Sequence, residues 1–174
     1  METNIKTAHK QKGGVVIGVI LVIIILTVIG LGAFKAFGYA TDKMNAGEAT
    51  TLVTEIGTGV QEMYANSNDY SSISTEVVVD AGIVPKSSVV GKTIVTPWYS
   101  SNSSSLITVI AGASPASFSV VVTAIPSSAC RAIGSAFLSA TASSVSANGS
   151  VVTDAGALAT GCAATDPATL TVNF

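Results

Sequence analysis

The chain has 174 residues, of which only 10% are charged, and its formal net charge is −2. Ordinary soluble domains carry about 25% charged residues, so this chain presents an unusually neutral surface. Such a surface offers no basic face to nucleic acid and little protection against self-association, so we expect no nucleic-acid binding and favour packing against copies of the same chain.

Residues 15–34 form an uncharged apolar run, VVIGVILVIIILTVIGLGAF, in which Thr27 carries the one hydroxyl. A helix of about 20 residues spans the roughly 30 Å hydrocarbon core of a membrane. Residues 1–14 before the run are polar and basic and end in Lys12-Gly13-Gly14. The apolar region of a secretory signal peptide is shorter, at about 7–15 residues, so the length of this run favours a membrane-spanning helix.

The helix is expected to continue beyond the membrane through residue 65. Apolar residues recur there three and four positions apart, which is the spacing of one helix face. Gly30, Gly32 and Gly38 weaken the middle of this helix, and the sequence leaves open whether they serve close helix packing or local unwinding. The apolar stripe consists of Ala46, Ala49, Val53, Ile56, Val60 and Met63, with Leu52 beside it.

Three carboxylates also share one stripe of this helix, because Glu48, Glu55 and Glu62 repeat every seven residues. Two interpretations remain open for them. The stripe is either simply solvated, or it pairs with cations elsewhere in the chain or on another subunit. The cations available for such pairs are Lys86, Lys92 and Arg131.

Residues 66–174 are expected to form one globular head after the turn residues at 66–69. Ser74 or Thr75 is expected to cap a short helix at 75–81, and Ser127 or Ser128 a helix that ends near residue 138. Short β-branched runs predict strands at 106–111, 118–124 and 170–174. Residues 142–149 are expected to form a loop, and a short strand is possible at 150–153. The predicted class is α+β: a long N-terminal α-helix, its apolar half protruding, packed on a small antiparallel sheet with a short disulfide-pinned helix.

The two cysteines, Cys130 and Cys162, both follow the apolar run. If the basic N-terminus stays in the cytoplasm, both cysteines lie outside, where an oxidising compartment favours a disulfide between them. The alternative is a pair of buried free thiols. Two cysteines without a nearby histidine do not complete a zinc site, so no metal is expected.

The residues needed for catalysis are missing. The single histidine, His9, lies in the N-terminal segment before the apolar run, so no Ser-His-Asp arrangement can form in the head. No glycine-rich phosphate loop follows a predicted strand. We therefore expect no catalytic residues, no cofactor and no enzymatic activity.

Taken together, these features resemble a type IV pilin, and in particular the type IVb branch, the pilins of conjugative thin pili and of some enteric pathogens. The resemblance is carried by Lys12-Gly13-Gly14 before the run at 15–34, by the amphipathic continuation to Met63, and by the two cysteines. The stretch 118–130, FSVVVTAIPSSAC, is similar to the strand, proline and cysteine-bearing helix of that branch. A strand at 170–174 after the second cysteine fits the same pattern.

This resemblance implies a pathway of processing and assembly. A prepilin peptidase of the bacterial inner membrane would cut after Gly13 or Gly14 and methylate the new N-terminus, and we favour Gly14 because apolar Val15 then comes first. The pilus assembly machinery would move the subunit from the membrane into an extracellular helical homo-oligomer. The assembly helix at the core of that filament would contain Val15, Gly18, Val19, Thr27, Gly30 and Gly32.

Pilins usually carry Glu at the fifth mature position, which is Val19 here when counted from Val15, or Gly18 when counted from Gly14. An unpaired ammonium group in an apolar filament core is costly. Three functions therefore remain open. The first is a structural pilus subunit for adhesion, surface contact or conjugative mating, and the second is a minor pilin or type II secretion pseudopilin that primes or caps a filament. The third is a single-pass anchored periplasmic binding domain.

Overall fold

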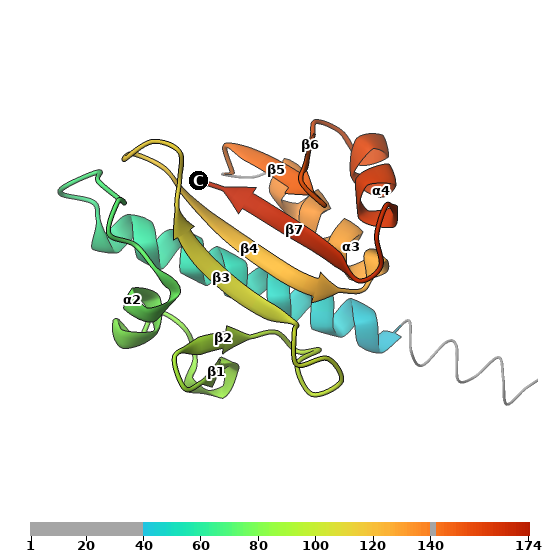
Figure 1. Ribbon diagram of the computed structural model, residues 1–174, viewed down its shortest axis with the longest axis horizontal. Helices are drawn as coiled ribbons and strands as arrows, with labels where there is room; N and C mark the ends of the chain where they lie inside the picture. Colours follow the sequence, from blue (N-terminus) through green and yellow to red (C-terminus); the bar gives the residue numbers. More distant parts are fainter. Residues whose placement is uncertain (1–39, 140–141) are drawn as a thin grey trace, which may run out of the picture. The chain divides into compact units, whose positions relative to one another are not determined.

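The computed structural model describes residues 40–139 and 142–174, so the expectations for residues 1–39 lie outside the described residues (Figure 1). Thr41–Phe174 form one compact unit. Within the described part of the chain, no helix has both the length and the apolar character needed to span a membrane.

The first described element is a helix over residues 40–63, which we call the N-terminal helix. Its buried face is the predicted apolar stripe, and the exposed fraction of every stripe residue up to Val60 is 3% or less. Met63 was predicted to belong to this face, but it is the last helical residue before a turn and is 41% exposed. The buried stripe therefore ends at Val60, one turn earlier than the sequence suggested.

The described strands form one seven-stranded sheet with the order β1-β2-β3-β4-β7-β5-β6. All neighbouring strands are antiparallel. The C-terminal strand therefore lies inside the sheet, and the N-terminal helix crosses behind β3 and β4 (Figure 1). The strands are β1 (Val89–Val90), β2 (Thr93–Val95), β3 (Leu106–Ala111), β4 (Phe118–Ile125), β5 (Ser144–Ala147), β6 (Ser150–Val152) and β7 (Ala168–Asn173).

The core lies between the N-terminal helix and the sheet. Side chains alternate along β3 and β7, so that every second residue is buried against the helix while threonines such as Thr108 and Thr171 are only half-buried. The apolar residues that the central strands contribute to this core are Ile107, Val109, Phe118, Val120, Val122, Leu170 and Val172.

Strand predictions succeeded where the apolar signal was strong. The strands predicted at 106–111 and 118–124 are confirmed as β3 and β4, and the closing strand is confirmed as β7, which begins at Ala168. The predicted loop at 142–149 was wrong, because β5 occupies part of it and pairs with both β6 and β7. Serines alternate there with Val145 and Ala147, so the buried face of β5 carries a weak hydrophobic signal.

The helices that follow in the chain are α2 (Thr75–Asp80), the 3-10 turn η1 (Lys86–Ser88), α3 (Ser127–Leu138) and α4 (Ala155–Ala163). The Ser74 hydroxyl accepts a hydrogen bond from the Val77 N–H, which confirms the predicted cap of α2. Neither predicted serine caps α3, because its N-cap residue is Pro126. The helix α4 was not predicted, because its sequence AGALATGCA is dominated by small residues with little apolar periodicity.

The only tryptophan, Trp98, lies in the loop after β2 and is 6% exposed. Its Nε1 donates a hydrogen bond to Asp42 Oδ1 at 3.2 Å, which links this loop to the first turn of the described helix. The N-terminal helix is therefore attached to the head by a polar contact at its start as well as by its apolar stripe. The α+β class predicted from the sequence is confirmed.

Candidate functional site

Most of the predicted site residues of the apolar run cannot be placed. The processing residues Gly13, Gly14 and Val15 lie outside the described residues, and so do the remaining assembly-helix positions, Gly18, Val19, Thr27, Gly30 and Gly32. The described candidates are the two cysteines and the six charged residues Glu48, Glu55, Glu62, Lys86, Lys92 and Arg131.

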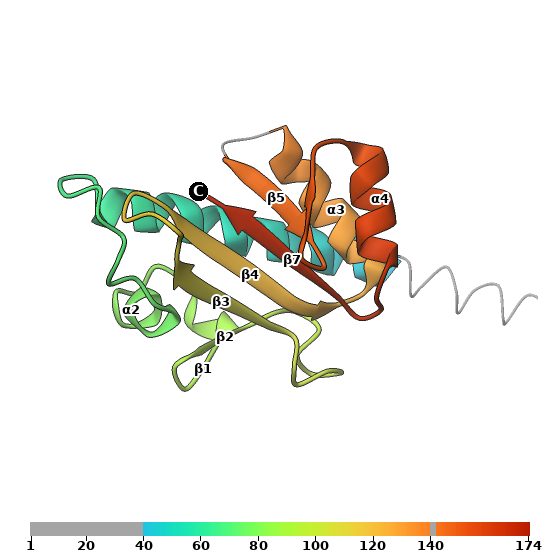
Figure 2. The same cartoon turned by 45° about the horizontal axis from the view of Figure 1, so that its top comes forward.

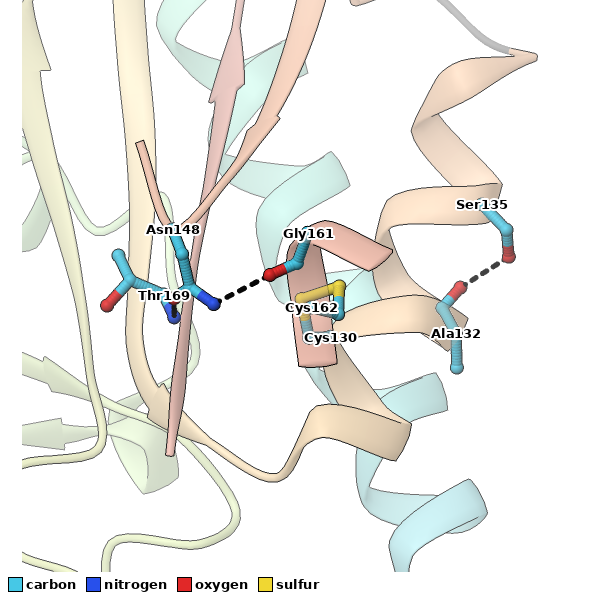
Figure 3. Close-up of a disulfide and its surroundings, with 7 residues drawn as sticks. All are labelled: Cys130, Ala132, Ser135, Asn148, Gly161, Cys162 and Thr169. Carbon is cyan, nitrogen blue, oxygen red and sulfur yellow. Dashed lines mark hydrogen bonds between the residues drawn. A yellow bond between two sulfur atoms is a disulfide. The ribbon is translucent and has the colours of Figure 1, made fainter. Parts of the chain in front are cut away.

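Cys130 of α3 and Cys162 of α4 form a disulfide, as the sequence predicts (Figure 3). Both residues are fully buried, and their Cα atoms lie 5.7 Å apart. The bond closes a loop with a sequence separation of 32 residues, and in the chain-entropy account a loop of this length contributes about 3–4 kcal/mol. Within residues 40–139 and 142–174, no group of three or more His, Cys, Asp or Glu side chains could hold a metal ion.

The side chain of Asn148 holds the same region together at a second point. Its Nδ2 donates to the Gly161 carbonyl of α4, and its Oδ1 accepts from the Thr169 N–H of β7, both at 2.8 Å (Figure 3). Asn148 and Gly149 both have positive φ, at 48° and 82°, as a two-residue hairpin turn between β5 and β6 requires. One half-buried amide therefore joins the β5–β6 turn, α4 and β7.

The three glutamates of the N-terminal helix stay separate from the head's cations. Glu48 and Glu62 are exposed and Glu55 is half-buried. Among the described residues, none of the three carboxylates has an ion pair, because the one pair found there joins Lys92 to Glu76. Both partners of that pair are more than half exposed, so it contributes only about 0–1 kcal/mol. The sequence did not anticipate Glu76 as the partner of Lys92.

A groove of about 560 Å³ runs between the N-terminal helix and the loop after α2. Glu55 and Glu62 lie in its walls, and the Thr58 hydroxyl between them already donates to the Thr54 carbonyl at 2.9 Å. This groove could not be predicted from the sequence, because it depends on how the loop after α2 folds back onto the helix. We call this the acidic groove, and its lining residues are Glu55, Thr58, Gly59, Glu62, Met63, Ala81, Gly82 and Ile83.

Glycine at position 59 allows the loop to approach the helix at this groove. A Cβ atom there would come within 2.5 Å of Ile83 Cγ2, so the close contact depends on the missing side chain. Gly82, with φ of 70°, supplies the left-handed turn that directs Ile83 back toward the helix. The acidic groove is therefore a product of two glycines that are 23 positions apart in the chain.

Comparison with known proteins places these features in context. The Bundlin family model matches residues 39–170, which include the described N-terminal helix, strands β1 to β6, the first half of β7 and both cysteines. The crystal structure of type IV b pilin from Salmonella typhi is similar, with a TM-score of 0.58, 23% identity, and coverage of 74% of this chain and 98% of that chain. At this level of identity the likeness shows a shared fold. No match was found among curated proteins.

Proposed function

This chain belongs to the Bundlin family and is a type IVb-like pilin, a structural subunit of a pilus, and we propose that it polymerises after processing into an extracellular homo-oligomeric filament. In this proposal residues 1–14 are a leader that prepilin peptidase removes at the inner membrane. Residues 15–65 are the pilin helix, and residues 66–174 are the head. No step of this function requires catalysis by the chain itself.

The apolar run at 15–34 would have two environments in turn, first the lipid bilayer and then the filament core. In both it contacts apolar groups, so its transfer conserves most of its burial, and the gain comes from closer packing of helices. The glycines in the run allow neighbouring backbones to approach closely. The head would remain outside this core, with the described half of the helix already packed on its sheet.

The observation that supports this proposal most directly is the extent of the family match, from residue 39 to residue 170. It includes the amphipathic helix that follows the apolar run as well as the head, rather than the head alone. The composition adds a physical reason for self-association: residues 93–174 carry only three charges, on Arg131, Asp154 and Asp166. Repulsion between copies over this part of the head is therefore weak.

A minor pilin that primes or caps the filament is the second candidate. The observation that favours it is the lack of any acid between residues 15 and 41, since Gly18 or Val19 stands where a glutamate usually neutralises a neighbour's N-terminus. The two candidates differ in stoichiometry. A repeating subunit would dominate the protein content of filaments sheared from cells, whereas a minor pilin would be a small fraction of it.

Replacement of both leader glycines tests the processing step. Gly13→Ala combined with Gly14→Ala should leave an uncut precursor in the membrane fraction, which gel mobility and intact-mass measurement detect. Gly18→Ala, inside the apolar run, is the matched control and should be processed normally. Normal cleavage of the double variant would refute the leader assignment.

A further inference from the structure

We propose that the acidic groove of one subunit receives Arg131 from the α3 helix of a second copy of this chain. The inference rests on the proposed function, because it names a contact between neighbouring subunits of the filament.

The groove is shaped and charged for a cationic side chain. Glu55 and Glu62 lie one above the other on the helix, seven residues or about 10 Å apart, and neither has an ion pair among the described residues. Thr58 and Gly59 lie between them on the helix, Ile83 packs against Gly59, and the loop wall also includes the small residues Ala81 and Gly82. Met63 supplies an exposed apolar surface at the rim, where the methylene groups of a long side chain can pack.

Arg131 lies on an exposed side of α3 beside small residues. Arg131 is exposed, is the only cation in residues 93–174, and has no ion pair among the described residues. On the same exposed side of α3 lie Ala132 and Ser135, which point away from the disulfide (Figure 3). The Ser135 hydroxyl is already bound to the Ala132 carbonyl at 2.9 Å. Arg131 is therefore flanked on α3 by small exposed side chains, so a neighbouring subunit can approach this part of the helix closely.

The two surfaces lie on different parts of the head. Figures 1 and 2 both show α2, next to the groove, at one end of the head and α3 at the other end, near the blue start of the N-terminal helix. A contact between two different surfaces of identical subunits is heterologous, and it propagates into a helical filament unless the rotation closes a ring. The position of the groove and the position of Arg131 therefore suit an open assembly.

The other described cations fit the groove less well. Lys43 and Lys92 already have interactions within their own chain. Lys86 follows Ile83 by three residues, so it belongs to the segment that forms one wall of the groove. A contact between this segment and the same segment of a neighbour would be close to isologous, which pairs two subunits instead of extending a filament. A guanidinium also has five donors in a planar fork, which suits binding to two carboxylates better than the single ammonium of a lysine.

Charge reversal on both sides of the contact tests the proposal in cells that assemble the full chain. Arg131→Glu should lower the yield of sheared filaments by about tenfold or more, because like charges facing one another across an interface oppose association. Glu55→Lys with Glu62→Lys should have the same effect. Combining all three substitutions should restore filaments, since the ion pairs re-form with opposite polarity. The subunit level in the membrane fraction normalises each yield.

Two matched controls accompany these variants. Glu48→Lys reverses a carboxylate of the same stripe outside the groove, and Lys86→Glu reverses a cation outside α3, so both should retain the wild-type yield. Wild-type yield from Arg131→Glu, or no restoration in the combined variant, would overturn the contact while leaving the pilus function intact. If Lys86→Glu lowers the filament yield and the added Glu55→Lys and Glu62→Lys substitutions restore it, the contact with Arg131 is wrong and Lys86 is the residue that enters the groove. Absence of the wild-type chain from filaments would overturn the pilus function and the contact with it.

Discussion

Three glycines of the N-terminal helix have different surroundings, and the differences matter for stability. A Cβ at position 57 would lie 2.7 Å from the ring of Phe174, and one at position 59 would lie 2.5 Å from Ile83. At position 47 it would have nothing within 4 Å. The first two glycines are therefore sites of close packing, whereas the third carries only the entropic cost of glycine in a helix.

Alanine substitutions at these positions should change stability in opposite directions. Gly57→Ala and Gly59→Ala should each lower the free energy of unfolding by about 1–3 kcal/mol through overpacking. Gly47→Ala should raise it by up to about 1 kcal/mol, because alanine favours the helix. Urea unfolding of the solubilised chain, followed by the fluorescence of buried Trp98, measures all three variants. Equal effects at the three positions would contradict this account of the packing.

Asn148 should contribute more to the free energy of unfolding than is usual for a residue in a surface turn. Asn148→Gly keeps a residue that accepts positive φ and the backbone hydrogen bond to the Thr169 carbonyl, but it removes the two side-chain hydrogen bonds to Gly161 and Thr169. It should therefore lower the free energy of unfolding by about 1–3 kcal/mol. Asn68→Gly is the matched control, because Asn68 also has φ of 48° but is exposed and has no side-chain hydrogen bond to another described residue. The same urea titration compares the two, and wild-type stability of Asn148→Gly would refute the role of its amide.

At the scale of elements, the disulfide joins α3 to α4 covalently, beside the packing of Leu158 on Gly134. The helix α4 has only nine residues, and its small side chains bury little apolar area beyond Leu158 and Cys162. The double variant Cys130→Ser with Cys162→Ser should therefore lose about 2–5 kcal/mol of stability. Protease resistance and urea unfolding under oxidising conditions measure the loss. Unchanged values for both would mean that α4 is held by packing alone.

Elements with a strong apolar period or a side-chain cap could be predicted from the sequence, and the others could not. β3 and β4 have runs of β-branched residues, and α2 has Ser74 as its cap. β5 and α4 consist mainly of Ser, Ala, Gly and Thr, whose burial depends on tertiary packing rather than on their own hydrophobicity. The cap of α3 was misplaced because Pro126, which sets the first turn, has no side-chain acceptor.

The candidate site was predictable to a similar degree. The pairing of Cys130 with Cys162 followed from their number and compartment, and the glutamate stripe followed from the spacing of seven. The acidic groove did not, because Ile83 reaches Gly59 only after the loop beyond α2 has turned at Gly82 and folded back. Interactions between segments distant in sequence leave no periodic signal in either segment.

At the scale of the whole molecule, the chain combines an apolar run long enough to cross a membrane with a head that belongs to the Bundlin family. The N-terminal helix, residues 40–63, is part of that head, because its apolar stripe is buried in the head's core. Glu55, Glu62 and Arg131 lie on the head with exposed or half-buried side chains and have no ion pair among the described residues. We therefore expect reversal of these charges to affect assembly rather than folding.

Mass spectrometry of the subunit in filaments sheared from the native cell tests the central claim most directly. We predict that the chain is a principal component of those filaments and that its first residue is Val15, or Gly14 if cleavage follows Gly13, with a methylated amine. Two results would contradict the claim, each in a chain confined to the membrane fraction. One is an intact Met1, and the other is a new N-terminus after Ala40, where Gly38-Tyr39-Ala40 has the small-x-small pattern of a signal-peptide cleavage site.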